Sequence, residues 1–221
     1  MSQQPNTSRP SGRPPADEAV SAEAVLDAAL AAFATFGYDG VSVRTLNREL
    51  GVSHNLINQR FGSKAGLWRA AVDHGFGSLV RYMEGVFDPT LTDPLDQLAL
   101  VISAFLRFSA EHPQLLGLMD IEGRLDTDRL TYIYDQYIAP SLAGVDRLLD
   151  HLIATGRIRP IPLRTLHFLI AHGAAAPFTL VPLAEHFDRS SPLSKRSVER
   201  HAKLISEIVV TGLRIPGNAA I

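Results

Sequence analysis

Apolar residues recur at helical spacing along most of the chain, and no stretch alternates apolar and polar residues as a β-strand does. Glycines, prolines and polar clusters separate the apolar stripes from one another. The pattern predicts an all-α protein of about nine helices, over residues 17–36, 42–50, 53–61, 64–87, 95–112, 115–121, 127–154, 163–186 and 193–213.

Prolines and glycines predict irregularities inside three of these helices. Pro140 predicts a kink in the helix over residues 127–154, because proline has no N–H to donate to the preceding turn. Pro177 and Pro182 interrupt residues 163–186 in the same way. Gly75 and Gly77 weaken the helix over 64–87, and we expect close packing there, with a flexible bend as the alternative.

Residues 42–64 have the spacing of two short helices joined by a tight turn. Leu46 and Leu50 lie one turn apart, as do Ile57 and Phe61, so each pair can face a common core. This is the layout of a helix-turn-helix, whose second helix enters the DNA major groove.

The residues between the two short helices suit a turn. Gly51 favours the left-handed conformation that ends a helix, and Val52 is an apolar plug between the helices. Ser53 is predicted to cap the second helix, as Ser42 caps the first and Ser63 caps the helix that follows.

Polar side chains follow the outer face of this helix-turn-helix. Asparagine and glutamine suit adenine edges and arginine suits guanine, while serine, lysine and free N–H groups suit phosphates. The predicted DNA-binding residues are Ser42, Arg44, Thr45, Ser53, His54, Asn55, Asn58, Gln59, Arg60 and Lys64.

Composition limits the kinds of partner and site that the chain can have. The formal net charge of −2 argues against a binder that depends on charge alone, although basic residues cluster locally around residues 44–69. The chain has no cysteine, which excludes disulfides and thiolate metal sites. No apolar run reaches the ~18–20 residues that span a membrane, so we expect a soluble cytoplasmic protein that makes no membrane contact.

The chain resembles the tetracycline-repressor-like (TetR) family of bacterial transcription regulators between residues 20 and 72. The residues that carry the resemblance are Ala29, Phe33, Gly37, Tyr38, Val41, Ser42, Val43, Arg44, Leu46, Leu50, Gly51, Val52, Ser53, Phe61, Ser63, Lys64, Leu67 and Trp68. The sequence departs from the family pattern at Asn47, Asn55 and Asn58, so the operator sequence cannot be taken from relatives.

The resemblance implies an all-helical homodimer that binds a palindromic double-stranded DNA operator and is released by a small effector. Its domains would be a disordered tail (1–17), a three-helix DNA-binding domain (18–63) and a larger ligand-binding and dimerisation domain (64–215). The last two helices would pair with those of the partner as a four-helix bundle.

Aromatic and polar residues in the C-terminal half are candidates for an effector cavity, with an apolar or aromatic effector expected. The predicted lining residues are Phe105, Phe108, Met119, Tyr134, Tyr137, Phe168, His172 and Phe178.

We expect no enzyme activity, no cofactor and no metal. The eight histidines show no paired-ligand spacing, and His167 and His172 are five apart, which is awkward for one face of an α-helix. Two alternatives stay open. One is a helical ligand-binding or interaction protein that has lost operator binding, and the other is an all-helical enzyme that uses Asp120, Glu122 and His172.

Overall fold

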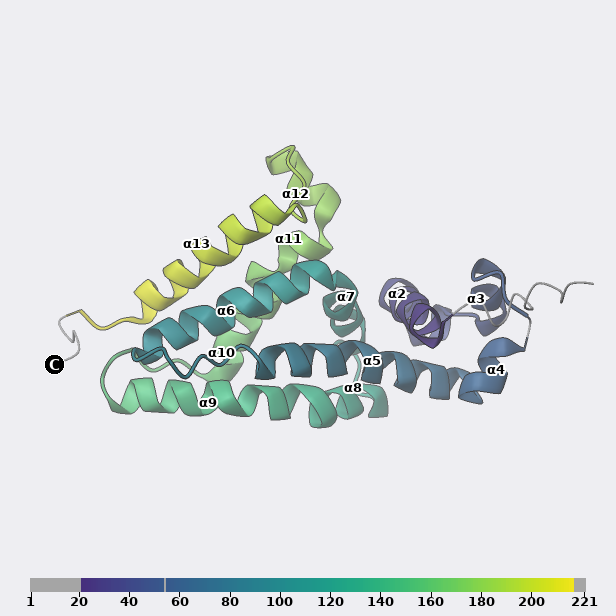
Figure 1. Ribbon diagram of the computed structural model, residues 1–221, viewed down its shortest axis with the longest axis horizontal. Coiled ribbons are helices and arrows are strands. Elements are labelled where there is room, and N and C mark those ends of the chain that lie inside the picture. Colours follow the sequence, from purple (N-terminus) through teal and green to yellow (C-terminus); the bar gives the residue numbers. More distant parts are fainter. Residues whose placement is uncertain (1–20, 54, 217–221) are drawn as a thin grey trace, which may run out of the picture.

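The computed structural model describes residues 21–53 and 55–216, and these ranges contain helices but no β-strand (Figure 1). The helices are α2 (Ala22–Gly40), α3 (Val43–Glu49), α4 (Leu56–Phe61), α5 (Lys64–Glu84), α6 (Pro94–Glu111), α7 (Pro113–Glu122), α8 (Asp128–Ile133), η1 (Tyr134–Ile138), α9 (Ala139–Ala154), α10 (Leu163–Phe168), η2 (Leu169–Ala174), α11 (Ala176–Thr179), α12 (Val181–Phe187) and α13 (Lys195–Leu213). The all-α prediction is confirmed, with about ten helices in these ranges once continuous segments are joined, rather than nine.

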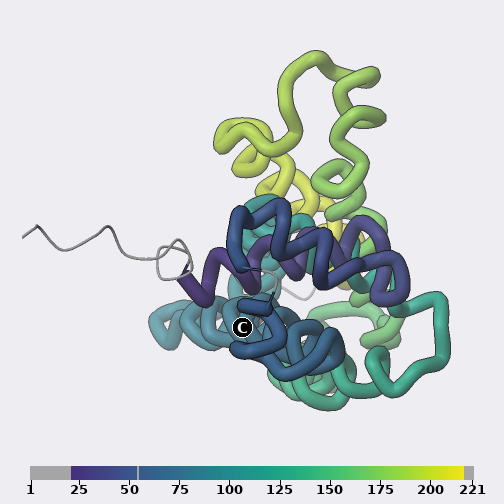
Figure 2. Tube along the Cα trace, turned by 90° about the vertical axis from the view of Figure 1, so that its right-hand side faces the viewer, coloured from purple at the N-terminus to yellow at the C-terminus, as the bar shows by residue number. Residues whose placement is uncertain are grey.

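The molecule is elongated, and α2, α3 and α4 form a small unit at one end of it (Figure 1). Helix α5 starts in that unit and runs along the long axis into the rest of the molecule. In the view turned by 90°, the chain around α11 and α12 projects from the body on the side away from α9 (Figure 2). Helix α5 is therefore the helix that joins the small unit to the larger part.

Serine side chains cap α3 and α5, the helices before and after α4. The Oγ of Ser42 accepts a hydrogen bond from the Thr45 N–H at 3.3 Å. The Oγ of Ser63 accepts one from the Gly66 N–H at 3.0 Å. Each cap satisfies an N–H group that has no partner within its own helix, so both predicted caps are confirmed.

The turn between α3 and α4 follows the prediction in its centre and differs at its end. Gly51 has a φ of 65°, in the left-handed region, and Val52 is buried. Helix α4 begins only at Leu56, whose N–H donates to the carbonyl oxygen of Ser53 at 3.2 Å. The second short helix therefore starts three residues later than Ser53.

Helix α2 is interrupted directly after residue 36, where the sequence predicts the end of the first helix. Gly37 has a φ of 68°, which interrupts the helix before its last residues. At its start, the Oγ of Ser21 accepts a hydrogen bond from the Ala24 N–H at 3.1 Å. The predicted tail over residues 1–17 and the predicted helical start at residues 17–20 lie outside the described residues.

A π-helical segment lies directly before Pro140, where the sequence predicts a kink. Helices α8, η1 and α9 run on without a break, and the Ala139 N–H donates to the Tyr134 carbonyl, five residues back. Because Pro140 has no N–H, the regular hydrogen-bond ladder cannot continue there, and the wider turn absorbs the interruption. A second π-helical segment, η2, precedes Pro177.

Two hydrophobic clusters stabilise the molecule. The N-terminal cluster combines the core of α2, α3 and α4 with residues of α5, α7 and α8; its members include Leu30, Phe33, Ile57, Trp68, Phe76, Leu118 and Ile133. The C-terminal cluster combines α6, α9, α10, η2, α11 and α13; its members include Leu98, Leu106, Leu149, Leu166, Phe178 and Val210. The core of the small unit therefore continues across the domain boundary that we predict at residue 63.

The apolar stripe of α5 ends earlier than the sequence predicts. Phe87, expected in that stripe, is 68% exposed and lies beyond the helix, which stops at Glu84. The chain turns at residues 85–93 before α6 begins, so Phe87 no longer shares the helical face of Phe76.

No single helix among the described residues is long and apolar enough to cross a membrane. One pair, Leu163–Thr179 with Val181–Phe187, meets the criteria of length and composition only when its two parts are counted together, and it is bent by 82°.

Gly75 marks the closest packing of α5. A Cβ atom built there would lie 2.7 Å from the Cδ2 atoms of both Leu30 and Leu115, on α2 and α7. A Cβ at Gly77 would meet only the end of the Arg81 side chain, at 3.3 Å. The close-packing interpretation of Gly75 is confirmed, because methyl-sized space is absent there.

We predict that Gly75→Ala lowers the free energy of unfolding by about 1 kcal/mol or more, since overpacking costs ~1–3 kcal/mol and the gain in helix propensity is at most ~1 kcal/mol. Gly77→Ala, the matched control on the same helix, should raise it by up to ~1 kcal/mol. Urea unfolding of both variants measures the difference. Equal stabilisation by both substitutions would contradict the packing argument.

Candidate nucleic-acid interface and ligand cavity

Helix α4 presents a polar outer face. Its Leu56 and Ile57 are buried, which turns Asn58, Gln59 and Arg60 toward solvent. Asn55, directly before the helix, is also exposed. The buried pair therefore orients the amide and guanidinium groups away from the core, as a helix that enters a DNA groove requires.

Helix α3 adds polar groups at its start. Ser42 and Arg44 are exposed and Thr45 is partly exposed, while Ser53 is exposed in the turn before α4. These positions suit contacts to the phosphate backbone. His54, which we also predict to contact DNA, lies outside the described residues.

Lys64 is held against the end of α2 rather than extended into solvent. Its Nζ donates to the carbonyl oxygen of Asp39 at 3.4 Å and lies 4.7 Å from the centre of the Tyr38 ring. A contact between Lys64 and a phosphate would have to share or replace these interactions, so its proposed phosphate role depends on a movement of the side chain.

Asn47 differs from the other two departures from the family pattern. It is fully buried, and its carbonyl oxygen accepts a hydrogen bond from the Val52 N–H at 3.0 Å. Asn47 therefore belongs to the interior of the turn, whereas Asn55 and Asn58 are exposed and remain candidates for base contacts.

An apolar cavity of about 120 Å³ lies between α5, α6, η1, α9, α10 and η2. A second cavity of about 60 Å³ adjoins it toward α7. Phe76 and Tyr137, on one wall of the larger cavity, belong to or pack against the N-terminal cluster, while Leu98 and Leu166 belong to the C-terminal cluster. The larger cavity is thus lined by residues of both clusters, so a molecule that fills it contacts both.

Five of the eight predicted lining residues reach these cavities. Phe105 lines both, and Tyr137 lines the larger one. Phe108, Met119 and His172 line the smaller one.

Three predicted lining residues lie elsewhere. Tyr134 and Phe168 are 53% and 56% exposed, because their positions on η1 and α10 face away from the interior. Phe178 is buried in the C-terminal cluster, with its ring centre 5.5 Å from that of His201. Helical spacing identifies all three as amphipathic or core positions but does not specify which face borders a void.

His167 lines both cavities and is absent from the predicted lining. Its ring centre lies 6.2 Å from that of His172, although the two residues are five apart. An α-helix would turn them away from each other, but the π-helical turn of η2 has a wider period and places them side by side. The expectation that this spacing is awkward was therefore wrong for this segment.

The histidine pair has distinct electrostatic surroundings. Burial, together with the nearby His172, lowers the pKa of His167, because a charged imidazolium is poorly solvated there. His172 is connected through its Nδ1 to the Oδ1 of Asp120 at 2.9 Å. In the described part of the chain, no group of three or more histidine, aspartate or glutamate residues is arranged to hold a metal ion.

The residues of the alternative enzyme hypothesis do not converge. Asp120 bonds to His172, but Glu122 is buried and accepts from the Nε of Arg129 at 3.0 and 3.1 Å. The guanidinium of Arg129 also lies 4.4 Å from the centre of the Tyr38 ring. Glu122 is thus engaged in a structural ion pair at the junction with α2, away from His172.

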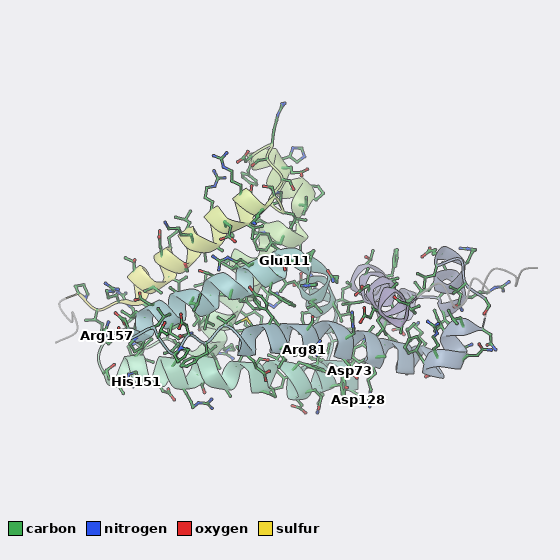
Figure 3. All side chains as sticks on the ribbon, viewed as in Figure 1. Asp73, Arg81, Glu111, Asp128, His151 and Arg157 are labelled. Carbon is green, nitrogen blue, oxygen red and sulfur yellow. The ribbon has the colours of Figure 1, made fainter. Side chains whose placement is uncertain are left out.

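The carboxylate of Asp73, on α5, connects that helix to η1, which forms part of the cavity wall. The hydroxyls of Tyr132 and Tyr137 both donate to the Oδ1 of Asp73, each at 2.6 Å. Figure 3 shows Asp73 near the middle of α5, between the small unit and Arg81. Burial and the bond to Asp73 raise the pKa of Tyr137. Since Tyr137 lines the cavity, movement of its wall is connected directly to α5.

Residues 25–71 match the family model of bacterial regulatory proteins of the tetR family. The match runs from α2 into α5 and includes the helix-turn-helix. It confirms the resemblance seen in residues 20–72 of the sequence. No curated protein matches the chain in sequence.

Solved structures match nearly the whole chain. KstR2 of Mycobacterium tuberculosis, a ketosteroid transcriptional regulator, is 19% identical, with a TM-score of 0.68 over 86% of this chain and 93% of that one. FadR from Bacillus subtilis, solved in complex with stearoyl-CoA, is 21% identical, with a TM-score of 0.61 over 86% and 98%. PfmR from Thermus thermophilus, a TetR family regulator, is 18% identical, with a TM-score of 0.61 over 86% and 99%. The C-terminal helices therefore share the fold of these regulators.

We predict that His167 makes the protein less stable in mild acid. Because the folded-state pKa of His167 lies below its ordinary value of 6.5, the unfolded chain binds the extra proton first. Stability that is present above pH ~6.5 is lost as the pH falls below it.

Urea unfolding between about pH 7.5 and 5.5 measures this effect. The stability of His167→Gln should fall less steeply than that of the unmodified protein, while the exposed control His186→Gln should behave like the unmodified protein. Parallel pH profiles for His167→Gln and the unmodified protein would contradict the burial argument.

Proposed function

We propose that this chain, whose N-terminal unit matches the tetR family, is a dimeric transcriptional repressor that a small apolar effector releases from DNA. The observation that carries the proposal is the placement of the apolar cavity. It lies between the cluster that supports the exposed polar face of α4 and the cluster of the C-terminal helices. Repression needs only steric blocking of a promoter, so no further catalytic group is required.

Base recognition is assigned to α4. One short helix supplies few contacts, so selective binding calls for two copies that bind half-sites about one helical turn (~34–36 Å) or a multiple apart. Asn55, Asn58 and Gln59 would contact adenine edges and Arg60 guanine or phosphate, at ~1–3 kcal/mol for each good bidentate pair. The formal net charge of −2 fits this arrangement, because charge alone would give weak binding.

Dimerisation is assigned to the exposed apolar side chains of α12 and α13. Phe187 is 86% exposed, and Ile208 is 56% exposed and lies one turn from the exposed Leu204. The adjacent exposed pair Leu204 and Ile208 favours a protein partner on this face of α13. The second copy of this chain is the partner that fits, because a two-fold pairing of these helices would orient two α4 helices toward one DNA.

Effector control fits the fold. The similar structures include a ketosteroid transcriptional regulator and a regulator solved with stearoyl-CoA, which supports a ligand site in the C-terminal helices. An effector changes DNA affinity only by binding one conformation more tightly than the other, and typical couplings of ~1–3 kcal/mol give about 5–150-fold changes. The bonds from Tyr132 and Tyr137 to Asp73 offer a direct path from the cavity to α5.

The principal alternative is a helical ligand-binding protein that no longer binds an operator. The outward-facing Asn55 and Asn58 keep this alternative open, since both depart from the family pattern at the DNA-facing surface. Specific retention of a DNA fragment from the promoter of its own gene favours the repressor. Retention no better than that of random DNA favours the alternative.

We predict that substitutions in α4 and α3 separate base recognition from phosphate contact. With a DNA fragment that the protein retains specifically, Gln59→Ala should reduce its preference over random DNA by about ten-fold or more. Arg44→Ala should weaken both DNAs alike and lower the salt slope by about one. Arg147→Ala, on the exposed surface of α9, is the matched control and should change neither.

Competition binding at several salt concentrations measures these effects. If Gln59→Ala and Arg44→Ala both reduced binding to specific and random DNA by the same factor, the assignment of base recognition to α4 would be refuted.

We predict that Ile208→Glu converts the dimer into a folded monomer, because it places a charge in the proposed apolar interface. Leu125→Glu is the matched control, since Leu125 is similarly exposed, at 51%, but lies in the connection between α7 and α8. Sedimentation velocity and circular dichroism measure mass and folding together. An unchanged dimer in Ile208→Glu would place the interface elsewhere.

A further inference from the structure

We propose that the effector is a compact, uncharged molecule with one hydrogen-bonding group, which the hydroxyl of Ser141 binds inside the larger cavity. The proposal rests on the function proposed above, because it takes that cavity as the effector site. It specifies the chemical class: small phenols, alcohols or ketones fit, and an ionised carboxylate inside the cavity is excluded.

The lining carries no charged side chain. Seventeen residues line the larger cavity, and none of them is an aspartate, glutamate, lysine or arginine. An ion taken from water into such surroundings needs a partner of opposite charge or several hydrogen bonds. His167 offers no such charge near neutral pH, because burial lowers its pKa. The part of the effector that lies inside the cavity must therefore be neutral.

The cavity is small. Its volume is about 120 Å³. A dry apolar cavity of ~150 Å³ in another protein accepts benzene, whereas pockets for drug-sized ligands measure ~300–1,000 Å³. The observed volume therefore matches a single ring or a short chain, and a long acyl chain or a nucleotide would require the helices to separate.

Ser141 supplies the polar contact. Its Oγ is shielded from solvent and has no hydrogen-bond partner among the described residues. Buried hydroxyls in folded proteins are nearly always paired, so this one calls for a partner in the cavity that Ser141 lines. The other lining hydroxyl, that of Tyr137, already donates to Asp73.

Ser141 lacks a partner for a structural reason. It follows Pro140 in the first turn of α9, directly after the π-helical segment η1. A serine in a regular helix often bonds to the carbonyl four residues back, but the π-helical turn shifts the carbonyls out of that register. The same irregularity thus gives the cavity a free hydroxyl, while the neutral imidazole of His167, which lines the cavity from α10, can donate or accept.

The test is isothermal titration calorimetry on the full-length protein without DNA, with phenol, toluene and benzoate as probes. Phenol and toluene have nearly the same shape and differ in one hydroxyl, while benzoate is ionised. Ser141→Ala should weaken phenol binding about five-fold and leave toluene within about two-fold, because only phenol loses a hydrogen bond. Ser206→Ala, a buried serine on α13 that donates to the Lys203 carbonyl, is the matched control and should change neither.

Several results would overturn the proposal. Benzoate that binds as tightly as phenol would refute the neutral class. Equal effects of Ser141→Ala on phenol and toluene would refute the role of Ser141. Absence of binding by both neutral probes would refute the assigned size and class.

The test of the ligand class can fail or succeed independently of the proposed function as a repressor. Calorimetry without DNA measures the ligand class alone, and a second titration follows retention of a specific DNA fragment as phenol is added. Phenol binding that depends on Ser141 while DNA binding stays constant supports the ligand class and refutes release by this site. Loss of DNA binding on phenol addition in the unmodified protein, reduced in Ser141→Ala, supports both.

Discussion

The packing of α5 against α2 and α7 is the constraint on which the rest of the structure depends. At Gly75 three helices approach so closely that a Cβ atom would lie 2.7 Å from two leucine side chains. Through this contact the small unit of α2, α3 and α4 shares one hydrophobic cluster with α5 and α7. A change in the position of α5 therefore shifts the cluster against which α4 packs. Phe76, on α5, lines the larger cavity, so a ligand bound there can cause that change.

The polar groups that line the larger cavity lie on or near the two π-helical segments. The π-helical segment before Pro140 carries Tyr137 and leaves Ser141 without its usual carbonyl partner, and the π-helical segment η2 brings His167 beside His172. In a regular α-helix the Ser141 hydroxyl could bond to the carbonyl four residues back, and side chains five residues apart would point away from each other. π-Helical segments are common at functional sites. Their wider turn disrupts the regular hydrogen-bond ladder and places side chains in positions that an α-helix does not allow.

The elements that depend on local physics could be predicted from the sequence. Ser42, Ser63 and Gly51 act through their own backbone neighbours, so caps and turn agree with the structure. The lining could be predicted only in part. Whether Tyr134 faces solvent or Tyr137 faces the cavity depends on the phase of a π-helical turn, and the burial of Asn47 depends on how α3 packs. The spacing of apolar residues along one helix indicates neither the phase of a π-helical turn nor the packing of one helix against another.

Selection of DNA from a random pool by the purified protein tests the central claim most directly. The account predicts that the enriched fragments contain an inverted repeat, with half-sites about one helical turn (~34–36 Å) or a multiple apart. That result would follow from two α4 helices related by a two-fold axis. Enrichment of no common sequence, or of a single site without symmetry, would contradict a dimeric operator-binding repressor.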